Sequence, residues 1–461
     1  MCRSAGAASG NEWFEEVKKT ATPEQLYTFL YALPKGGDLH DHLSGAARSE
    51  WMWDAALAQE QRGYIYYTKV AIHNCVPYGS NEYGATPYLL LFRNLTTANY
   101  QKLDECQRSE YKRLQDLDAR EKAGWLNSLR LDQPYEGRNE FFGAHWQRLG
   151  DLFVNPYWTA ETMYQNMEAF AKEGVVYLEL QSPLAGYEKP DGTPVTLDEA
   201  ADIFRSRLAA ADARATGVTV RFQTTILRFT PNAEDQLREA YAIADKYRDL
   251  YVGVNMVGRE DDDKGYPLRF LPTLRELRHK YPDINLSIHG GEVDEPNFHV
   301  RDTLLLGATR IGHGVNLITD PETMVLMRYG PYMVEINLIS NLLLEYVKDY
   351  SQHPFPEYLR IGIPVALSTD DRGMWDSNMS DEYFVAVREF NLSWSEMVQL
   401  GRNSLSHSFV DATTKQKLLA DYEKRVSAFA EKFQKSGWAS LKGVKPVSYT
   451  FLCKHYSLCL Q

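Results

Sequence analysis

Closely spaced cysteine pairs are absent from this chain of 461 residues. Without a C-x-x-C pair, the usual zinc-ribbon and thioredoxin-type motifs are excluded. The same absence excludes the P-C-x-x-C signature of the cytidine-type zinc nucleobase deaminases. An odd number of cysteines without a dense framework predicts that disulfides are not the main source of stability, although the sequence allows one disulfide. The five cysteines are Cys2, Cys75, Cys106, Cys453 and Cys459.

Long apolar runs and an excess of positive charge are also missing. No run of about 18 apolar residues exists, so no membrane span is predicted, and the N-terminus has no secretory hydrophobic region. Acidic residues outnumber basic ones, 62 to 50, which gives a net charge of −12. This balance argues against a nucleic-acid backbone or an anionic membrane as partner. A small, neutral or weakly charged substrate fits better.

Residues 1–10 are small and polar and start with Met-Cys-Arg-Ser. One interpretation is a disordered tail. The other is the remnant of an exported start, with Cys2 as a former lipid anchor. The compartment therefore stays unknown, and an exported or periplasmic form is one of its options.

Strand-like runs alternate with helical patterns over most of the chain, and this alternation predicts a parallel sheet. Eight strands in this arrangement predict an α/β fold of the (β/α)8 TIM-barrel type. The predicted strands are 38–43, 175–180, 218–227, 251–257, 284–289, 310–312, 332–337 and 364–368. The predicted helices of the barrel are 159–172, 196–215, 233–247, 268–280, 300–306, 321–327, 382–390, 394–404 and 412–435.

The predicted domain organisation has three parts. Residues 1–32 form a tail and a helical lead-in with short helices at 15–20 and 23–33. The barrel occupies 33–440, and 441–461 form a C-terminal tail.

The barrel is interrupted after its first strand by a predicted insertion at about 46–153, which is rich in aromatic residues, proline and glycine. Its expected elements are a strand at 64–67 and a charged helix at 105–123. A separate small domain is the alternative interpretation of this segment.

Histidines and acids cluster where several predicted strands end. Strand 284–289 ends at His289, and two glycines then lead to Glu292, which is how a TIM barrel presents chemical groups. A hydrogen-bonded structural histidine is the alternative. His313, flanked by glycines at the end of another strand, would suit a general base close to the barrel axis.

The first and last strands add the residues of a predicted metal site. His40 and His42 share one face of their strand because side chains alternate with a period of two. Asp370 and Asp371 follow the eighth strand, which neighbours the first in a closed barrel. Together with His289, these residues predict an open zinc-type site, in which a metal generates hydroxide near neutral pH. An exposed polar turn and a solvated helix cap are the alternatives for the two motifs.

The ordered motif series resembles the adenosine deaminase family. It consists of Leu-Pro-Lys at 33–35, His40-x-His42, His289-Gly-Gly-Glu292, Arg-Ile-Gly-His313-Gly and Ser-Thr-Asp370-Asp371. The Pro-Lys-Gly-Gly start, the segment Val-Gly-Arg-Glu-Asp at 257–261 and the long insertion are similar to the adenosine deaminase-related growth factor branch. The resemblance covers about residues 33–45 and 157–410.

The resemblance implies a role for each matched residue. One zinc ion per chain would be held by His40, His42, His289 and Asp370. Glu292 would donate a proton to purine N1, and His313 would orient and help to activate the attacking water. Asp371 would hold purine N7, and the Gly258 backbone would face N3.

Two positions depart from the family pattern and bear on the substrate. Ser44 stands where many members carry an acid that receives the ribose 5′-hydroxyl. Arg372 follows the paired acids where proline is usual. If 5′-modified nucleosides are strongly rejected, Arg372 or a group from the insertion is the first candidate for the residue that receives the 5′-hydroxyl.

Three functional hypotheses follow. The first is zinc-dependent deamination of adenosine-type nucleosides to inosine-type products and ammonia. The second is a related aminohydrolase acting on another aminopurine or a 5′-modified adenosine. The third is an extracellular growth-factor-like binding protein with a secondary deaminase site. The family branch also implies a homodimer that pairs through the N-terminal helices.

Overall fold

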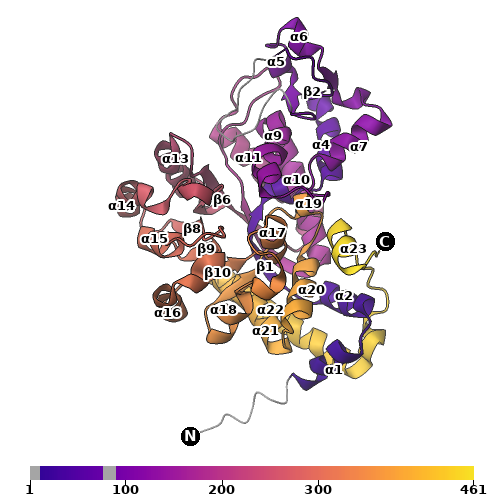
Figure 1. Ribbon diagram of the computed structural model, residues 1–461, viewed down its shortest axis with the longest axis vertical. Helices are drawn as coiled ribbons and strands as arrows, with labels where there is room; N and C mark the ends of the chain where they lie inside the picture. Colours follow the sequence, from indigo (N-terminus) through magenta and orange to yellow (C-terminus); the bar gives the residue numbers. More distant parts are fainter. Residues whose placement is uncertain (1–10, 76–89, 461) are drawn as a thin grey trace.

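The computed structural model describes residues 11–75 and 90–460, and the predicted tail 1–10 lies outside them (Figure 1). Eight parallel strands form one sheet in sequence order. The Asp370 N–H donates to the His40 carbonyl at 2.8 Å, and the two ends of the sheet meet there. The predicted TIM barrel is therefore confirmed. Its strands are β1 (Gly36–His42), β5 (Val175–Gln181), β6 (Thr219–Leu227), β7 (Tyr251–Val257), β8 (Asn285–Gly290), β9 (Arg310–His313), β10 (Met333–Ile336) and β11 (Val365–Leu367).

The first strand ends one residue earlier than predicted, at His42, and the helix α3 (Leu43–Ala46) follows at once. The turn brings Gly45 against the last barrel strand. A Cβ atom on Gly45 would lie 1.7 Å from Asp371 Oδ1, so only glycine permits this approach. Ser44 consequently lies in a helix rather than on the strand.

Helices surround the barrel, and their ends follow local capping signals. Thr196 and Glu199 form the predicted capping box at the start of α11. The single helix predicted for 196–215 is wrong, because the structure has two helices separated at Ala209–Ala210. The helices are α10 (Pro156–Lys172), α11 (Leu197–Leu208), α12 (Ala211–Ala215), α13 (Ala233–Lys246), α14 (Leu271–Lys280), α15 (His299–Leu306), α16 (Pro321–Tyr329), α17 (Leu338–Leu343), α18 (Phe355–Ile361), α19 (Arg372–Trp375), α20 (Met379–Phe390), α21 (Trp394–Ser406), α22 (Ala412–Ser436) and α23 (Thr450–Tyr456).

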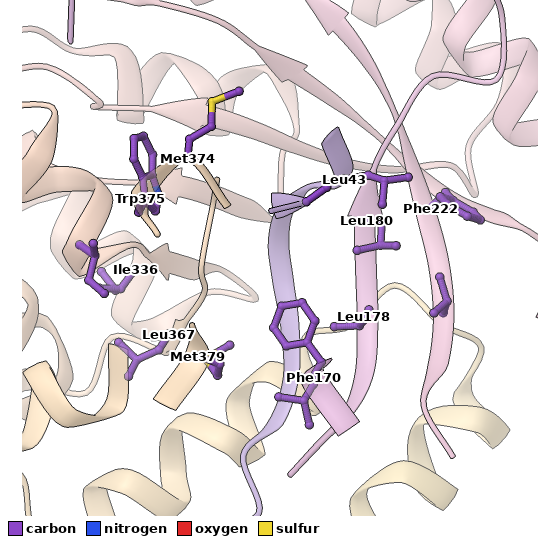
Figure 2. Packing of buried hydrophobic residues seen from close by; sticks show 14 of the residues in the cluster. Leu43, Phe170, Leu178, Leu180, Phe222, Ile336, Leu367, Met374, Trp375 and Met379 are labelled. Carbon is purple, nitrogen blue, oxygen red and sulfur yellow. The ribbon is translucent and has the colours of Figure 1, made fainter. Parts of the chain in front are cut away.

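The main apolar core lies between the barrel strands and the helices outside them (Figure 2). Leu178 and Leu180 of β5 belong to this core together with Phe170 of α10. Because strand side chains alternate, the residues between and after these leucines, Glu179 and Gln181, point into the barrel. The barrel interior is therefore partly polar, and it positions the site described below.

The N-terminal lead-in packs against the C-terminal helices of its own chain. It consists of α1 (Glu12–Thr20) and α2 (Pro23–Ala32). The Trp13 ring lies 4.8 Å from that of Trp394, and Phe14 and Phe29 are fully buried. The apolar side of the lead-in is thus used within one chain. Homodimer formation through this segment stays a prediction.

The insertion contains a three-stranded antiparallel sheet in the order β3-β2-β4. The helix predicted for 105–123 is wrong. Asp104 and Asp118 each form a separate capping box and start two short helices, and a strand paired with β2 lies between them. The strands are β2 (Tyr66–Lys69), β3 (Asn94–Thr96) and β4 (Tyr111–Arg113), and the helices include α4 (Ser49–Ala58), α6 (Glu105–Arg108), α7 (Ala119–Asn127), α8 (Arg138–Glu140) and α9 (Trp146–Leu149).

The boundaries of the predicted domains, including the insertion at 46–153, stay a prediction. Across the described ranges, the longest helices are too polar to cross a membrane.

Two disulfides join four of the five cysteines. Cys75 pairs with Cys106 in the insertion, and Cys453 pairs with Cys459 in the C-terminal tail. The sequence left room for one bridge, and the structure has two.

Thiol titration tests this pairing. Under denaturing conditions without reductant, the purified chain should show no more than one reactive thiol, and reduction should raise the number to five. Reduction should also lower the melting temperature, because a native bridge typically contributes about 2–4 kcal/mol. Three or more thiols before reduction would contradict the pairing.

Candidate active site

A cavity of about 560 Å³ opens at the carboxyl ends of the barrel strands. Its volume lies within the roughly 300–1,000 Å³ range of small-molecule sites. His40 is fully buried and does not line the cavity itself, but it contacts Asp370, which does. The predicted site residues that line the cavity are His42, Ser44, Gly258, His289, Glu292, His313, Asp370 and Asp371.

The four predicted metal ligands lie close together, although His42 meets the group only through Asp370 and His289. Asp370 Oδ1 lies 3.3 Å from His40 Nε2 and 3.2 Å from His42 Nε2. His42 Nε2 lies 3.1 Å from His289 Nε2. Three imidazole nitrogens and one carboxylate facing one another are the ligand set that zinc prefers.

The electrostatics of this group favour a positive charge at its centre. Burial lowers the pKa of His289 well below its ordinary value and keeps the ring neutral. Burial also acts to lower the pKa of His40, but hydrogen bonds to Asp370 and Glu335 outweigh it and raise the pKa to about 10. A proton on His40 thus occupies the place that a cation would take. Metal binding at such a site releases protons.

Beneath the ligands, buried polar side chains from seven barrel strands form a continuous chain of hydrogen bonds and ion pairs. Both ends of the chain are candidate metal ligands. In order, its members are His40, Glu335, Arg310, Glu179, Gln223, Asn255 and His289.

Arg310 lies at the middle of this chain. Its guanidinium is 2.7 Å from both Glu179 and Glu335, and all three side chains are fully buried. Glu335 accepts a hydrogen bond from His40 Nδ1 at 2.8 Å. Burial acts to raise the pKa of Glu335, but Arg310 and His40 outweigh it, so the pKa is lowered. An ionised Glu335 fixes the His40 proton on Nδ1.

On the other side of Arg310, two amides connect Glu179 to His289. Gln223 donates to Glu179 at 2.9 Å, and Asn255 donates to the Gln223 carbonyl oxygen at 2.8 Å. The Asn255 oxygen therefore faces His289 Nδ1, at 3.1 Å, and accepts its proton. With Nδ1 held by an oxygen acceptor in both rings, His289 turns an Nε2 lone pair toward the centre of the site, and His40 does so once it releases its second proton, as metal-ligating histidines do. The residues fit a metal ion.

Sequence reasoning missed four members of this chain: Glu179, Gln223, Asn255 and Glu335. Glu179, Asn255 and Glu335 are each a polar residue in the middle of an apolar strand run, and Gln223 lies in a mixed one. That pattern is the signal for a polar barrel interior, but it does not show which residues pair.

The loop that carries Glu292 is held from below by Glu260. The Glu260 carboxylate accepts the N–H groups of Gly291 and Glu292, each at 3.2 Å, and it lies 2.8 Å from His299 Nδ1. Burial, together with the charges of Asp370 and Glu260, raises the pKa of Glu292 well above its ordinary value. This environment favours the protonated form of Glu292 at the cavity wall.

His313 and Asp371 complete the cavity floor. His313 Nε2 lies 3.7 Å from Glu292 Oε2. Burial and the charges of Asp370 and Asp41 raise the pKa of Asp371 well above its ordinary value. Within the described residues, Asp371 Oδ1 has no hydrogen-bond partner. It is a buried polar atom that a ligand would satisfy.

Gly258 leaves its backbone open to the cavity. Its φ is +103°, and a Cβ atom there would lie 2.7 Å from the Phe229 ring. A side chain at this position is therefore excluded, and a flat ligand can approach the peptide group.

The two departures from the family pattern have different outcomes. Ser44 lines the cavity, although it does so from helix α3 and not by strand alternation. Arg372 points elsewhere: it pairs with Glu173 at 2.9 Å and lies 3.6 Å over the Phe170 ring. Arg372 is therefore a poor candidate for a group that receives the 5′-hydroxyl.

The insertion supplies one wall of the cavity, which sequence reasoning did not assign. Its ring pair Trp146 and Phe153 is stacked, with centroids 6.1 Å apart. A turn of π-helix at Phe141–His145 precedes Trp146, and such turns are frequent at functional sites. The lining residues from the insertion are Arg93, Phe141, Phe142, Trp146, Gln147, Gly150 and Phe153.

Gln181 was also missed. It ends β5, lines the cavity and is 4% exposed. Neither its amide nitrogen nor its amide oxygen has a hydrogen-bond partner in the part of the chain that the structure describes. A buried amide with both atoms unpaired is a recognition group for a polar ligand.

Comparisons with known proteins assign the chain to a family. The protein-family model for adenosine deaminase matches residues 142–425. Adenosine deaminase 2 of Dictyostelium discoideum is 34% identical over 174 residues, which cover 36% of this chain but only 32% of that protein. Adenosine deaminase 2-A of Danio rerio is 23% identical, covering 95% of this chain and 86% of that protein.

A solved structure shares the fold. An amidohydrolase from Burkholderia ambifaria with bound zinc has a TM-score of 0.64 and is 19% identical. The match covers 90% of this chain and 96% of that chain.

Proposed function

Because this chain belongs to the adenosine deaminase family, we propose that it hydrolyses the 6-amino group of adenosine-type nucleosides to give inosine-type products and ammonia. The observation that carries the proposal is the pairing of a cation site with a buried, protonated acid. Glu292 follows the candidate ligand His289 after two glycines, and both line one cavity.

One zinc ion per chain would be held by His40, His42, His289 and Asp370. Zinc held there would supply a strong nucleophile from water at neutral pH. The buried chain through Arg310 supports this assignment, because it presents lone pairs of His40 and His289 to the same point.

The remaining residues bind and polarise the purine. The protonated Glu292 donates to N1, which withdraws electrons from C6 and favours attack by water there. Asp371 holds N7, the Gly258 backbone faces N3, and His313 orients the attacking water. The 6-amino group then leaves as ammonia.

The metal assignment is tested first. Purified protein should contain about one zinc ion per chain by elemental analysis. His289→Ala should lose both zinc and activity, because it removes a ligand. His279→Ala, a change at an exposed histidine of α14, is the control and should keep both. Full activity in a metal-free preparation would refute the assignment.

The acid assignment predicts a loss of rate without a loss of metal. Glu292→Gln should retain zinc while kcat falls by about 10²–10⁴-fold, the usual contribution of general acid catalysis. The raised pKa keeps the Glu292 proton at neutral pH, and the proton is lost as pH rises through that pKa. The kcat of the unmodified enzyme should therefore fall on the alkaline side. A Glu292→Gln variant with most of its kcat would place the proton donor elsewhere.

Tolerance of the 5′-position follows from Ser44. An acid there would be left unpaired by a 5′-modified substrate, at a cost of roughly 1–3 kcal/mol, whereas serine is small and neutral. We expect 5′-deoxyadenosine and 5′-methylthioadenosine to have kcat/KM within about tenfold of adenosine. Ser44→Asp should widen the gap in favour of adenosine, and Ser44→Ala should not. A thousandfold rejection by the unmodified protein would show that another group receives the 5′-hydroxyl.

A second candidate substrate is a nucleoside 5′-phosphate, favoured by one observation. Among the described lining residues, Arg93 is the only lysine or arginine. If it meets a phosphate, Arg93→Gln should lower kcat/KM for AMP at least tenfold and leave adenosine within twofold. Arg120→Gln, at an exposed position of α7, is the matched control. Equal effects on AMP and adenosine would exclude this role.

The binding-protein hypothesis has weaker support. The insertion would be its contact surface, yet part of the insertion already forms a wall of the cavity. We therefore infer that the insertion acts first in substrate binding.

A further inference from the structure

His313 differs from the candidate ligands in what its Nδ1 atom faces. In His40 and His289, Nδ1 faces an oxygen acceptor. In His313, Nδ1 lies 3.1 Å from the Asn341 amide nitrogen, which is a donor. The Asn337 amide nitrogen lies 3.3 Å from the same atom. A ring nitrogen that accepts hydrogen bonds carries no proton, so the proton of a neutral His313 lies on Nε2.

The orientation of the Asn341 amide is set by His353. The Phe355 backbone N–H donates to His353 Nδ1 at 3.1 Å. Burial lowers the pKa of His353 to about 3 and keeps this ring neutral, so its proton lies on Nε2. That proton is donated to the Asn341 oxygen at 3.0 Å. The amide nitrogen of Asn341 must then face His313.

We propose that His353 and Asn341 are positioning residues that hold His313 as the Nε2–H tautomer, and that His313 therefore acts as a hydrogen-bond donor and not as a base. The Nε2–H would donate to the oxygen that attacks the purine. This last step rests on the proposed function, whereas the tautomer does not depend on it.

Burial and an unmet donor support the proposal. His313, Asn341 and His353 are 1%, 0% and 3% exposed, so water does not compete for their hydrogen bonds. Within the described residues, His313 Nε2 has no hydrogen-bond partner. A buried N–H that points into a cavity without a partner is costly unless a ligand satisfies it.

The tautomer would also keep His313 out of the metal site. Ring nitrogens of His40, His289 and His313 and an oxygen of Asp370 all lie within 4.8 Å of one another. Distance alone would therefore admit His313 to the metal site. A protonated Nε2 has no lone pair for a metal, and it has none to take a proton from water. The prediction of a base at this position is revised accordingly.

Nitrogen NMR of the zinc-loaded enzyme with ¹⁵N-histidine reads the tautomer directly. Comparison with His313→Gln assigns the His313 signals. We expect the chemical shift of a protonated nitrogen at Nε2 and of an unprotonated one at Nδ1. The reverse pattern in the unmodified enzyme would overturn the proposal. An inactive enzyme with the expected tautomer would instead count against the proposed function.

Variants distinguish a positioning role of His353 and Asn341, called the arm from here on, from a general effect on stability. Asn341→Asp places a carboxylate opposite His313 Nδ1 and should move the proton there, with zinc retained. Its kcat should fall at least 100-fold while KM stays within threefold. His353→Leu should lower kcat at least tenfold, and His353→Gln, which keeps a donor, should restore most of it. An Asn341→Asp enzyme with an unchanged tautomer and kcat within twofold would refute the proposal.

Tyr358→Phe is the matched control. It removes a buried hydrogen bond of 2.9 Å from Tyr358 to the Gly314 carbonyl, next to His313 but outside the arm. The tautomer and kcat should stay unchanged. A loss of kcat in Tyr358→Phe as large as that in Asn341→Asp would show that any loss of packing near His313 has this effect, and the arm would have no special role.

Discussion

The ion pairs of Arg310 inside the barrel are the interaction on which the site depends. A guanidinium buried between Glu179 and Glu335 is expensive to desolvate, and a buried ion pair is weak evidence for stability. Its effect here is on orientation. Each carboxylate is aligned by the arginine, and each determines, directly or through amides, which nitrogen of a distant histidine carries a proton. The same arrangement gives the barrel its polar interior.

Histidine rings within this small volume are oriented in two opposite ways by the groups behind them. Acceptors behind His40 and His289 turn lone pairs inward, whereas the donor behind His313 turns a proton inward. The three rings are close in space and similar in burial, so their environment and not their position decides what each one does. Glu292 follows the same logic: the pKa of its carboxyl is raised because the residue is buried near other negative charges.

The barrel and the convergence of the site residues could be predicted from sequence, because both depend on local patterns. Strand–helix alternation located the strands to within about two residues, and motifs at strand ends named His289, Glu292 and Asp370. Features that depend on tertiary pairing were not predictable. Examples are the partners of Glu179, the cavity wall formed by Trp146, and the direction of Arg372. Ser44 lines the cavity as expected but from a helix, since the strand ends at His42 and α3 begins at Leu43.

The polar chain inside the barrel also constrains the order of barrel closure and metal binding at the proposed site. His40 and Glu335 are 295 residues apart in sequence, so their hydrogen bond exists only after the first and penultimate strands have met. In a zinc finger, by contrast, the ion drives folding because its ligands are local. Here the ligand histidines acquire the correct tautomers only when the sheet has closed. A metal ion at the proposed site would therefore bind late, because an unclosed chain offers it no preorganised place.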